Sequence, residues 1–150
     1  MNPPHRISAG ALVIREGRVL LVKHRIPGQD EFWVPPGGGA EGDESLMDCA
    51  VRECFEETGL RVRALKFAYV EEFFAAGRRI CKHWIHCELI SGEINFSHAT
   101  DEERDVLQEA RFVSRSEIAA LNFFPRLMRD QFWADHAAGF PATRYLGFES

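Results

Sequence analysis

The sequence predicts a mixed α/β fold of the α+β kind, in which a mixed β-sheet is sandwiched between α-helices. Two patterns predict this fold. Runs rich in branched and aromatic residues lie on both sides of one long helical segment, and one or two further helical segments follow near the end. The 150 residues suffice for one hydrophobic core, and no repeat or linker divides them. We therefore expect a single domain over residues 1–150.

The first elements are expected to be two strands joined by a tight turn. Ala11–Ile14 and Val19–Val22 are apolar runs, and the Glu-Gly pair between them is a hairpin signal. A break follows at DEFWVPPGGGAEGDE, residues 30–44, where Pro35–Gly42 contains two prolines and four glycines. We expect no regular structure in that segment.

A helix is predicted to begin near Glu44 or Ser45 and to end at Gly59, a residue type typical of helix ends. At about 100° per residue, its apolar side chains share one broad face that should pack on the sheet. That face consists of Leu46, Met47, Ala50, Val51 and Cys54.

The pattern becomes strand-like from Val62 onward. The segments VRALKFAYVEEFFA and RICKHWIHCELISGEI predict strands, and SHATDEERDVLQEA predicts an acidic loop with at most one helical turn. A short strand, RFVS, and a short helix, SRSEIAAL, follow. The segment FPRLMRDQFWADHAAG predicts a C-terminal helix that stops at Gly139.

Composition and charge exclude several classes of function. The net charge is −5 with no long basic block, which argues against duplex nucleic acid as a partner. No apolar run approaches 18 residues, so we expect no membrane span. The N-terminus does not resemble a secretory signal, and the four cysteines form no C-x-x-C pair. Reduced thiols and a cytoplasmic location are the simplest interpretation.

Three glutamates stand at helical spacings near the end of the predicted helix: Glu53, Glu56 and Glu57. Like charges at these spacings destabilise a helix, and the negative end of the helix dipole adds to the cost. One interpretation is a solvated acidic face. The other is a site for hard divalent cations, which bind carboxylate oxygens and neutralise the crowded charge.

The residues around the glutamates decide between these interpretations. The segment GGAEGDESLMDCAVRECFEETGL, residues 38–60, resembles the Nudix box: Gly, five residues, Glu, seven residues, Arg-Glu, an aliphatic residue, one residue, Glu-Glu, one residue, Gly and an aliphatic residue. The matching positions here are Gly38, Glu44, Arg52, Glu53, Cys54, Glu56, Glu57, Gly59 and Leu60. The departure is Cys54, which replaces an aliphatic residue and behaves as a small hydrophobe.

The resemblance to Nudix hydrolases implies a metal-dependent enzyme with the Nudix fold. Glu53, Glu56 and Glu57 would ligate Mg²⁺ or Mn²⁺, and the carbonyl near Gly38 would complete the set. The ions would promote attack of water on the diphosphate linkage of a nucleotide-like small molecule.

The same resemblance gives Glu44 and Arg52 a bracing role, in which they pair and hold the loop against the helix. The general base stays open at this point. It would be Glu56 or Glu57 of the box, or an acid of the distal acidic loop. The distal candidates are Asp101, Glu102, Glu103, Asp105 and Glu109.

Contacts to the substrate are predicted from fewer signals. Lys23 and Arg25 end the second strand, in a position that resembles the basic strand end of many relatives, and Arg25 suits bidentate phosphate binding. Four aromatic side chains could stack on a base: Trp33, Phe73, Phe74 and Trp84. Surface charge and core packing are the competing interpretations of these residues.

The sequence leaves the substrate open among nucleoside triphosphates, nucleotide sugars and ADP-ribose. The alternative function is a nucleotide-sensing regulator on the Nudix fold, although such proteins often lose box glutamates and this chain keeps them. An isoprenoid diphosphate isomerase would need a further Cys and Glu in a longer chain. A homodimer is common among relatives, and that expectation is analogy alone.

Overall fold

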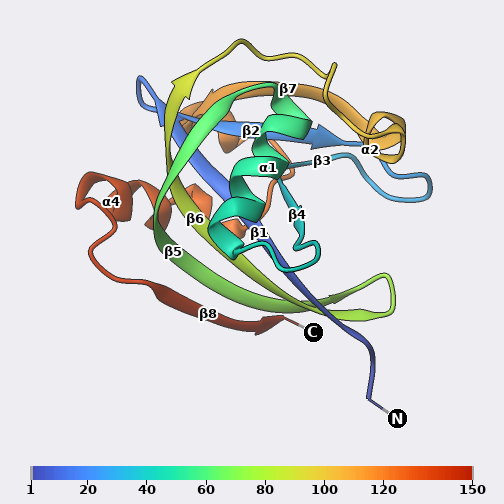
Figure 1. Cartoon of the computed structure of the whole chain (residues 1–150). Coiled ribbons are helices and arrows are strands. Elements are labelled where there is room, and N and C mark those ends of the chain that lie inside the picture. Colours follow the sequence, from blue (N-terminus) through green and yellow to red (C-terminus); the bar gives the residue numbers. More distant parts are fainter. Residues whose placement is uncertain (1, 150) are drawn as a thin grey trace.

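A mixed eight-stranded sheet forms the centre of the computed structural model, which describes residues 2–149 (Figure 1). The strand order is β3-β2-β1-β6-β5-β8, with β4 beside β1 and β7 beside β2. The strands are β1 (His5–Arg15), β2 (Arg18–His24), β3 (Phe32–Val34), β4 (Gly37–Gly39), β5 (Arg61–Ala75), β6 (Arg78–Ser91), β7 (Leu107–Ser114) and β8 (Arg144–Glu149). The predicted mixed α/β fold is confirmed.

Strand β1 holds the sheet together because it pairs with three other strands. It is parallel to β6 and antiparallel to β2 and β4. Its side chains alternate between the two faces of the sheet, as the period of a strand requires. Leu12 belongs to one hydrophobic core, whereas Ala11 and Val13 belong to the other.

Helices cover both faces of the sheet. On one face lies α1 (Leu46–Thr58), whose Cys49, Ala50 and Cys54 pack against strand residues. The short elements η1 (Arg126–Arg129) and α4 (Gln131–Ala137) cover the other core. Figure 1 shows α1 in front of the sheet and α4 beyond its edge. The predicted sandwich is therefore confirmed.

Helix α1 has the boundaries that its capping residues predict. The Ser45 hydroxyl accepts a hydrogen bond from the backbone N–H of Asp48 at 3.0 Å, which satisfies one free donor of the first turn. At the other end, Gly59 adopts φ 78°, a conformation that other residues adopt at a cost. The helix thus stops one turn after Glu53 and directly after the last carboxylate of the motif.

Several predicted elements were wrong in detail. The predicted break at residues 30–44 contains two short strands, β3, which pairs with β2, and β4, whose glycines pair with β1. The residues after α2 (Asp101–Val106) continue as strand β7 because they pair with β2, so the predicted RFVS strand is longer. Helix α3 (Arg115–Ile118) follows β7 but is shorter than the predicted segment SRSEIAAL.

The predicted C-terminal helix is divided into η1 and α4, and strand β8 follows without having been predicted. Strand β8 lies at the edge of the sheet and pairs in parallel with β5. Most of its residues are exposed, so its sequence shows little of the alternation that identifies a half-buried strand. Among residues 2–149, no helix has the length and apolar character needed to cross a membrane.

A buried carboxylate ties α4 to the sheet. Asp135 is 5% exposed and accepts a hydrogen bond from the Tyr69 hydroxyl at 2.6 Å. Arg144 of β8 donates to both Asp135 oxygens, at 2.9 and 2.8 Å, and Gln131 donates at 2.9 Å. These contacts, led by the Arg144 hydrogen bonds, hold the pKa of Asp135 below its usual range.

We predict that Asp135→Asn lowers the free energy of unfolding by about 1–3 kcal/mol at pH 7, because the amide cannot accept all of these hydrogen bonds. Asp130→Asn is the control: Asp130 is 75% exposed and pairs with Arg115, so its loss should cost less than about 0.5 kcal/mol. Urea unfolding measures both.

The wild type and Asp135→Asn also test the sign of the pH dependence of the free energy of unfolding. A carboxyl whose folded pKa is lowered stabilises the fold fully above its unfolded pKa, about 3.9 for Asp. That stabilisation is lost as the pH falls through the folded pKa. The difference between wild type and Asp135→Asn should therefore shrink below about pH 4, and a difference that grows there would contradict the assignment.

Candidate metal centre and active site

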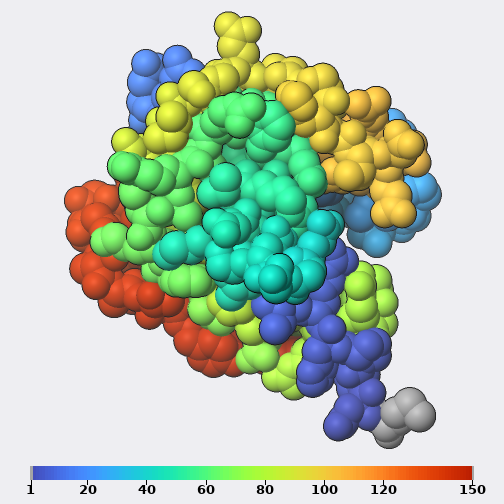
Figure 2. Space-filling model, in the orientation of Figure 1, coloured from blue at the N-terminus to red at the C-terminus, as the bar shows by residue number. Residues whose placement is uncertain are grey.

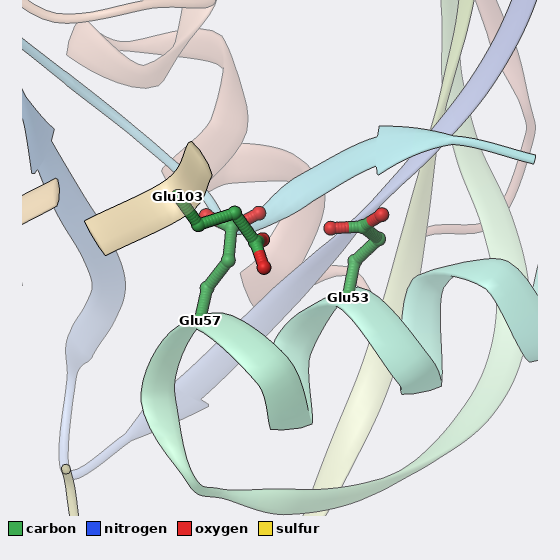
Figure 3. Close-up of side chains that lie close together, drawn as sticks. All are labelled: Glu53, Glu57 and Glu103. Atoms are coloured by element: carbon green, nitrogen blue, oxygen red, sulfur yellow. The ribbon is translucent and has the colours of Figure 1, made fainter. Parts of the chain in front are cut away.

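Helix α1 places two of its glutamates against the body of the protein. Glu53 and Glu57 lie one helical turn apart and are 7% and 2% exposed. Figure 3 shows both side chains projecting from the same side of α1, with Glu103 reaching toward them from α2. One carboxylate oxygen of each of these three residues lies within 4.8 Å of the others. The structure thus brings together two box glutamates and one acid of the distal loop.

Segments far apart in sequence surround this cluster. In Figure 2 the α2 segment lies against the C-terminal part of α1 on one face of the molecule. A cavity of about 490 Å³ between them is lined by Glu53, Glu56, Glu57 and Glu103, by Gly37 and Gly38, and by Arg6 and His24. The predicted metal ligands and the acidic loop therefore share one cavity.

The glycine segment before α1 approaches the carboxylates closely. The backbone N–H of Gly37 donates to Glu57 Oε1 at 3.1 Å. A Cβ atom at Gly38 would lie 2.5 Å from Glu53 Oε1, so any side chain there would displace the carboxylate. The Gly38 carbonyl, the predicted fourth metal ligand, accepts a hydrogen bond from the Cys49 thiol at 3.5 Å. Glycine is needed at position 38 for this close approach.

Arg52 braces the loop and the helix as the motif predicts. Its guanidinium donates to Glu44 at 3.0 and 2.6 Å and to the Gly39 carbonyl at 3.1 Å. The same side chain donates to Glu53 at 2.9 Å and to Glu56 at 3.2 Å. The Arg52 hydrogen bonds lower the pKa of Glu44 to about 2. Arg52 therefore orients Glu53 while its charge is balanced by Glu44.

The electrostatics of the cluster disfavour three negative charges. Burial, followed by the negative charges of Glu53 and Glu103, raises the pKa of Glu57 well above its usual range. Burial also raises the pKa of Glu53, although Arg52 opposes it. Glu57 Oε2 is buried and has no hydrogen-bond partner among residues 2–149. Such an atom costs free energy unless a ligand satisfies it.

The carboxylates of Glu53, Glu57 and Glu103 are suited to bind a divalent cation. All three are carboxylates, which supply the hard oxygen ligands that Mg²⁺ and Mn²⁺ prefer. The buried, unpartnered oxygen of Glu57 would gain a partner from the cation. Positive charge would also relieve the repulsion within the cluster. Glu56 lines the same cavity but is less enclosed, and its role as a ligand stays a prediction.

The cavity also contains basic residues that the sequence analysis missed. His24 Nε2 lies 4.0 Å from Glu57 Oε2, beyond hydrogen-bonding distance, and burial lowers the pKa of His24 to about 4. Arg6 lines the cavity and abuts Gly39. Lys82 of β6 lies behind Gly37 and attracts Glu57 electrostatically. Because these residues are distant in sequence, only strand pairing reveals them.

The predicted substrate residues lie outside the glutamate cavity. Lys23 forms an ion pair with Glu31 at 3.0 Å, and Arg25 lies 3.8 Å from the same carboxylate. Trp33 is 6% exposed and packs in the core, with Arg111 4.9 Å from its ring centroid. Their roles in substrate binding stay predictions, and their surroundings agree with the competing interpretations of surface charge and core packing.

The five acidic residues of the distal loop lie in different surroundings. Glu103 joins the cluster, and Asp101 and Glu102 line the same cavity. Asp105 lines a neighbouring cleft with Arg25, and Glu109 pairs with Arg111 at 3.2 Å. Glu103 also caps its own helix, since one of its oxygens accepts the Thr100 N–H at 2.9 Å. Glu103 is therefore the distal acid best placed to act with the box.

The fold and the site define an α/β domain with an acidic helix set in a glycine-lined cavity. The model of the NUDIX domain matches residues 4–132, and the chain belongs to the Nudix family. Phosphatase NudJ from Escherichia coli K12 is 35% identical over 75 residues, which is 50% of this chain and 48% of that protein. The chain thus spans about half the length of the curated relatives it matches.

Solved structures share the fold. A NUDIX hydrolase from Nitrosomonas europaea has a TM-score of 0.75 at 23% identity, covering 99% of this chain and 80% of that one. The MutT protein from Methanosarcina mazei Go1 has a TM-score of 0.71 at 23% identity, with 95% and 99% covered. An ADP-ribose pyrophosphatase from Streptococcus suis has a TM-score of 0.67 at 20% identity, with 96% and 98% covered.

Glu57→Gln tests whether the cluster is a cation site. Without metal, the neutral amide removes a buried repulsive charge, so we predict a gain of about 1 kcal/mol, or roughly 3–4 °C in Tm. A carboxyl whose folded pKa is raised costs stability as the pH rises above its unfolded pKa, so the gain should be larger at pH 8 than at pH 5.

Added Mn²⁺ should then raise the Tm of the wild type and leave that of Glu57→Gln nearly unchanged, because only a protein that binds the ion is stabilised by it. Glu93→Gln, at an exposed loop position, is the control and should behave like the wild type. Equal Mn²⁺ shifts in the wild type and Glu57→Gln would argue that the ion binds elsewhere. Scanning calorimetry in the presence and absence of Mn²⁺ measures the shifts.

Proposed function

We propose that this chain is a Mg²⁺- or Mn²⁺-dependent hydrolase that cleaves the diphosphate linkage of a nucleoside diphosphate derivative. The observation that carries the proposal is the convergence of Glu53, Glu57 and Glu103, with an oxygen of Glu57 buried and unpartnered. Solvated acidic faces rarely bury their carboxylates. Membership of the Nudix family supports the same class of reaction.

We infer that Glu53 and Glu57 hold the cation from α1. Arg52 keeps Glu53 in position, and the Gly37 N–H orients Glu57. A divalent cation bound there supplies positive charge that neutralises the phosphoanhydride oxygens and makes the phosphorus easier to attack. The lack of a side chain at Gly38 leaves room for the Glu53 carboxylate beside the backbone.

Glu103 is the proposed general base. Its carboxylate faces the cluster from α2, and one of its oxygens is fixed by the helix cap. The other oxygen can accept a proton from the attacking water while Glu53 and Glu57 remain ionised. Arg6, which lines the same cavity, would balance negative charge on the phosphates. The products would be two phosphorylated fragments.

The proposed substrate class rests on the shared chemistry of the relatives. Their printed names include a phosphatase, an ADP-ribose pyrophosphatase, a UDP-X diphosphatase and MutT proteins. A nucleoside triphosphate, a nucleotide sugar and ADP-ribose all contain a diphosphate linkage that this site could hold. We infer a small nucleotide as the partner of this site.

We predict phosphate or phosphomonoester release from a panel of nucleoside triphosphates, nucleotide sugars and ADP-ribose with Mg²⁺. Chelation should abolish release and Mn²⁺ should restore it. Glu57→Gln should reduce release at least about 100-fold with its circular dichroism spectrum intact, because the charge stabilisation at the phosphates is lost. Binding across the panel without turnover would favour a nucleotide-sensing regulator instead.

Glu103→Gln separates the general base from the metal ligands. The amide cannot accept the proton, so we expect kcat to fall roughly 10²–10⁴-fold while the Mn²⁺-induced rise in Tm persists. Asp105→Asn is a matched control in the same helix, because Asp105 lines a different cleft and should retain near wild-type turnover. Loss of the Mn²⁺ shift in Glu103→Gln would make Glu103 a ligand instead of the base.

A further inference from the structure

His24, at the end of β2, lines the glutamate cavity and has no part in the chemistry described above. Its side chain is 18% exposed. Among residues 2–149, its Nε2 atom and Glu57 Oε2 are both buried without a hydrogen-bond partner. These two atoms lie 4.0 Å apart, which is too far for a hydrogen bond between them. A ligand placed between them would satisfy both.

The pattern of β2 explains why His24 points toward α1. Side chains alternate along a strand, so His24 shares its side of β2 with Leu20, which belongs to the hydrophobic core beneath α1. Lys23 points the other way, toward the ring of Trp33. The pairing of β2 with β7 is also irregular between Lys23 and His24, and such bulges redirect side chains. The register of β2 thus directs the imidazole into the cavity.

The imidazole is held in place by its surroundings. It stacks on Phe32 of β3, with ring centroids 5.1 Å apart and planes 11° apart. Phe32 lines a neighbouring cavity of about 380 Å³, which we call the aromatic cavity. The other aromatic side chains of its lining are Phe73, Phe74, Trp84 and Phe124. Because the stack fixes the plane of the ring, Nε2 stays directed at Glu57.

The end of β2 is also tied to the helix that carries Glu103. The backbone N–H of Arg25 donates to the Val106 carbonyl, the last residue of α2, at 2.8 Å. In the register of β2 with β7, His24 lies opposite Leu107, the next residue of the chain. His24 and Glu103 are therefore held in the same part of the cavity wall.

A single metal ion can satisfy both unpartnered atoms. Bonds from a zinc-sized ion to an imidazole nitrogen and to a carboxylate oxygen are each about 2.1 Å, so one ion can contact two atoms 4.0 Å apart. Closing this separation by about 1 Å gives the usual spacing of two neighbouring ligands. Oxygens of Glu53 and Glu103 lie within 4.8 Å of a Glu57 oxygen, so the same ion would keep its carboxylates.

The charges around His24 agree with a cation at this position. Two basic side chains oppose one: Lys82, whose ammonium acts on both His24 and Glu57, and Arg6, which lines the cavity. The carboxylates that line the cavity outnumber these two. Negative charge therefore prevails where the ion would lie.

We propose that His24 Nε2 is a nitrogen ligand of the metal centre, beside Glu57, and that it biases the site toward first-row transition ions over Mg²⁺. The proposal rests on the cation site of the proposed function and not on hydrolysis. Imidazole nitrogen suits ions such as Co²⁺ and Zn²⁺, whereas Mg²⁺ prefers oxygen ligands. A site made of carboxylates alone would discriminate less between these ions.

Bound Mn²⁺ reports a nitrogen ligand directly. In electron spin-echo envelope modulation of Mn²⁺ on the wild type, without nucleotide, we expect the signal of a coordinated nitrogen. His24→Gln should lose this signal, because the amide offers an oxygen to the ion. His98→Asn is the control and should keep it, since His98 is exposed and packs on Phe55. Bound Mn²⁺ without nitrogen coupling in the wild type, or coupling that persists in His24→Gln, would overturn the proposal.

Metal affinities measured by titration calorimetry test the bias. His24→Gln should raise the Kd of Co²⁺ at least about tenfold, because even the partners of metal ligands are worth roughly 10–100-fold in affinity. The Kd of Mg²⁺ should stay within about threefold, since an oxygen replaces the nitrogen. An unchanged Mg²⁺ affinity also shows that the variant is folded. Equal changes for the two ions, or no change for Co²⁺, would overturn the bias.

The results also separate this inference from the proposed function. Nitrogen coordination of Mn²⁺ with no hydrolysis of any nucleotide in the panel would refute the hydrolase and keep His24 as a ligand. Hydrolysis by a protein whose Mn²⁺ is bound through oxygen alone would refute only the role of His24. A wild type that binds no Mn²⁺ would refute both.

Discussion

The burial of two carboxylates one turn apart on α1 is the constraint on which the rest of the site depends. Glu53 and Glu57 repel each other and face a cavity that a third acid, Glu103, also enters. Neither the helix nor its dipole compensates for this charge. Arg52 balances part of it but is itself shared with Glu44. The remaining deficit of positive charge is the feature on which the proposed cation site rests.

The packing of α1 on the sheet compensates for the free-energy cost of the buried acidic side chains. The opposite side of α1 buries Cys49, Ala50 and Cys54 against the sheet, and this packing holds the helix in place. The close glycine strand β4 then supplies backbone groups to the carboxylates without side chains that would block them. Stability from the hydrophobic face thus offsets the strain of the acidic edge.

The two adjoining cavities differ in character. One is lined mainly by carboxylates and glycines, and the other mainly by aromatic rings. Gly37, Lys82 and the His24–Phe32 stack form the wall between them.

The sequence alone determined the features that depend on local spacing. Helix periodicity and capping located α1, and the spacing of its acids led to the proposed cation site, because these properties involve residues within a few turns of one another. Tertiary structure alone decided which distal acid reaches the cluster, and it brought Arg6, His24 and Lys82 beside it. Strand β8 and the aromatic cavity also became visible only in the tertiary structure. Strand register and pairing set these contacts, and both depend on residues far apart in the chain.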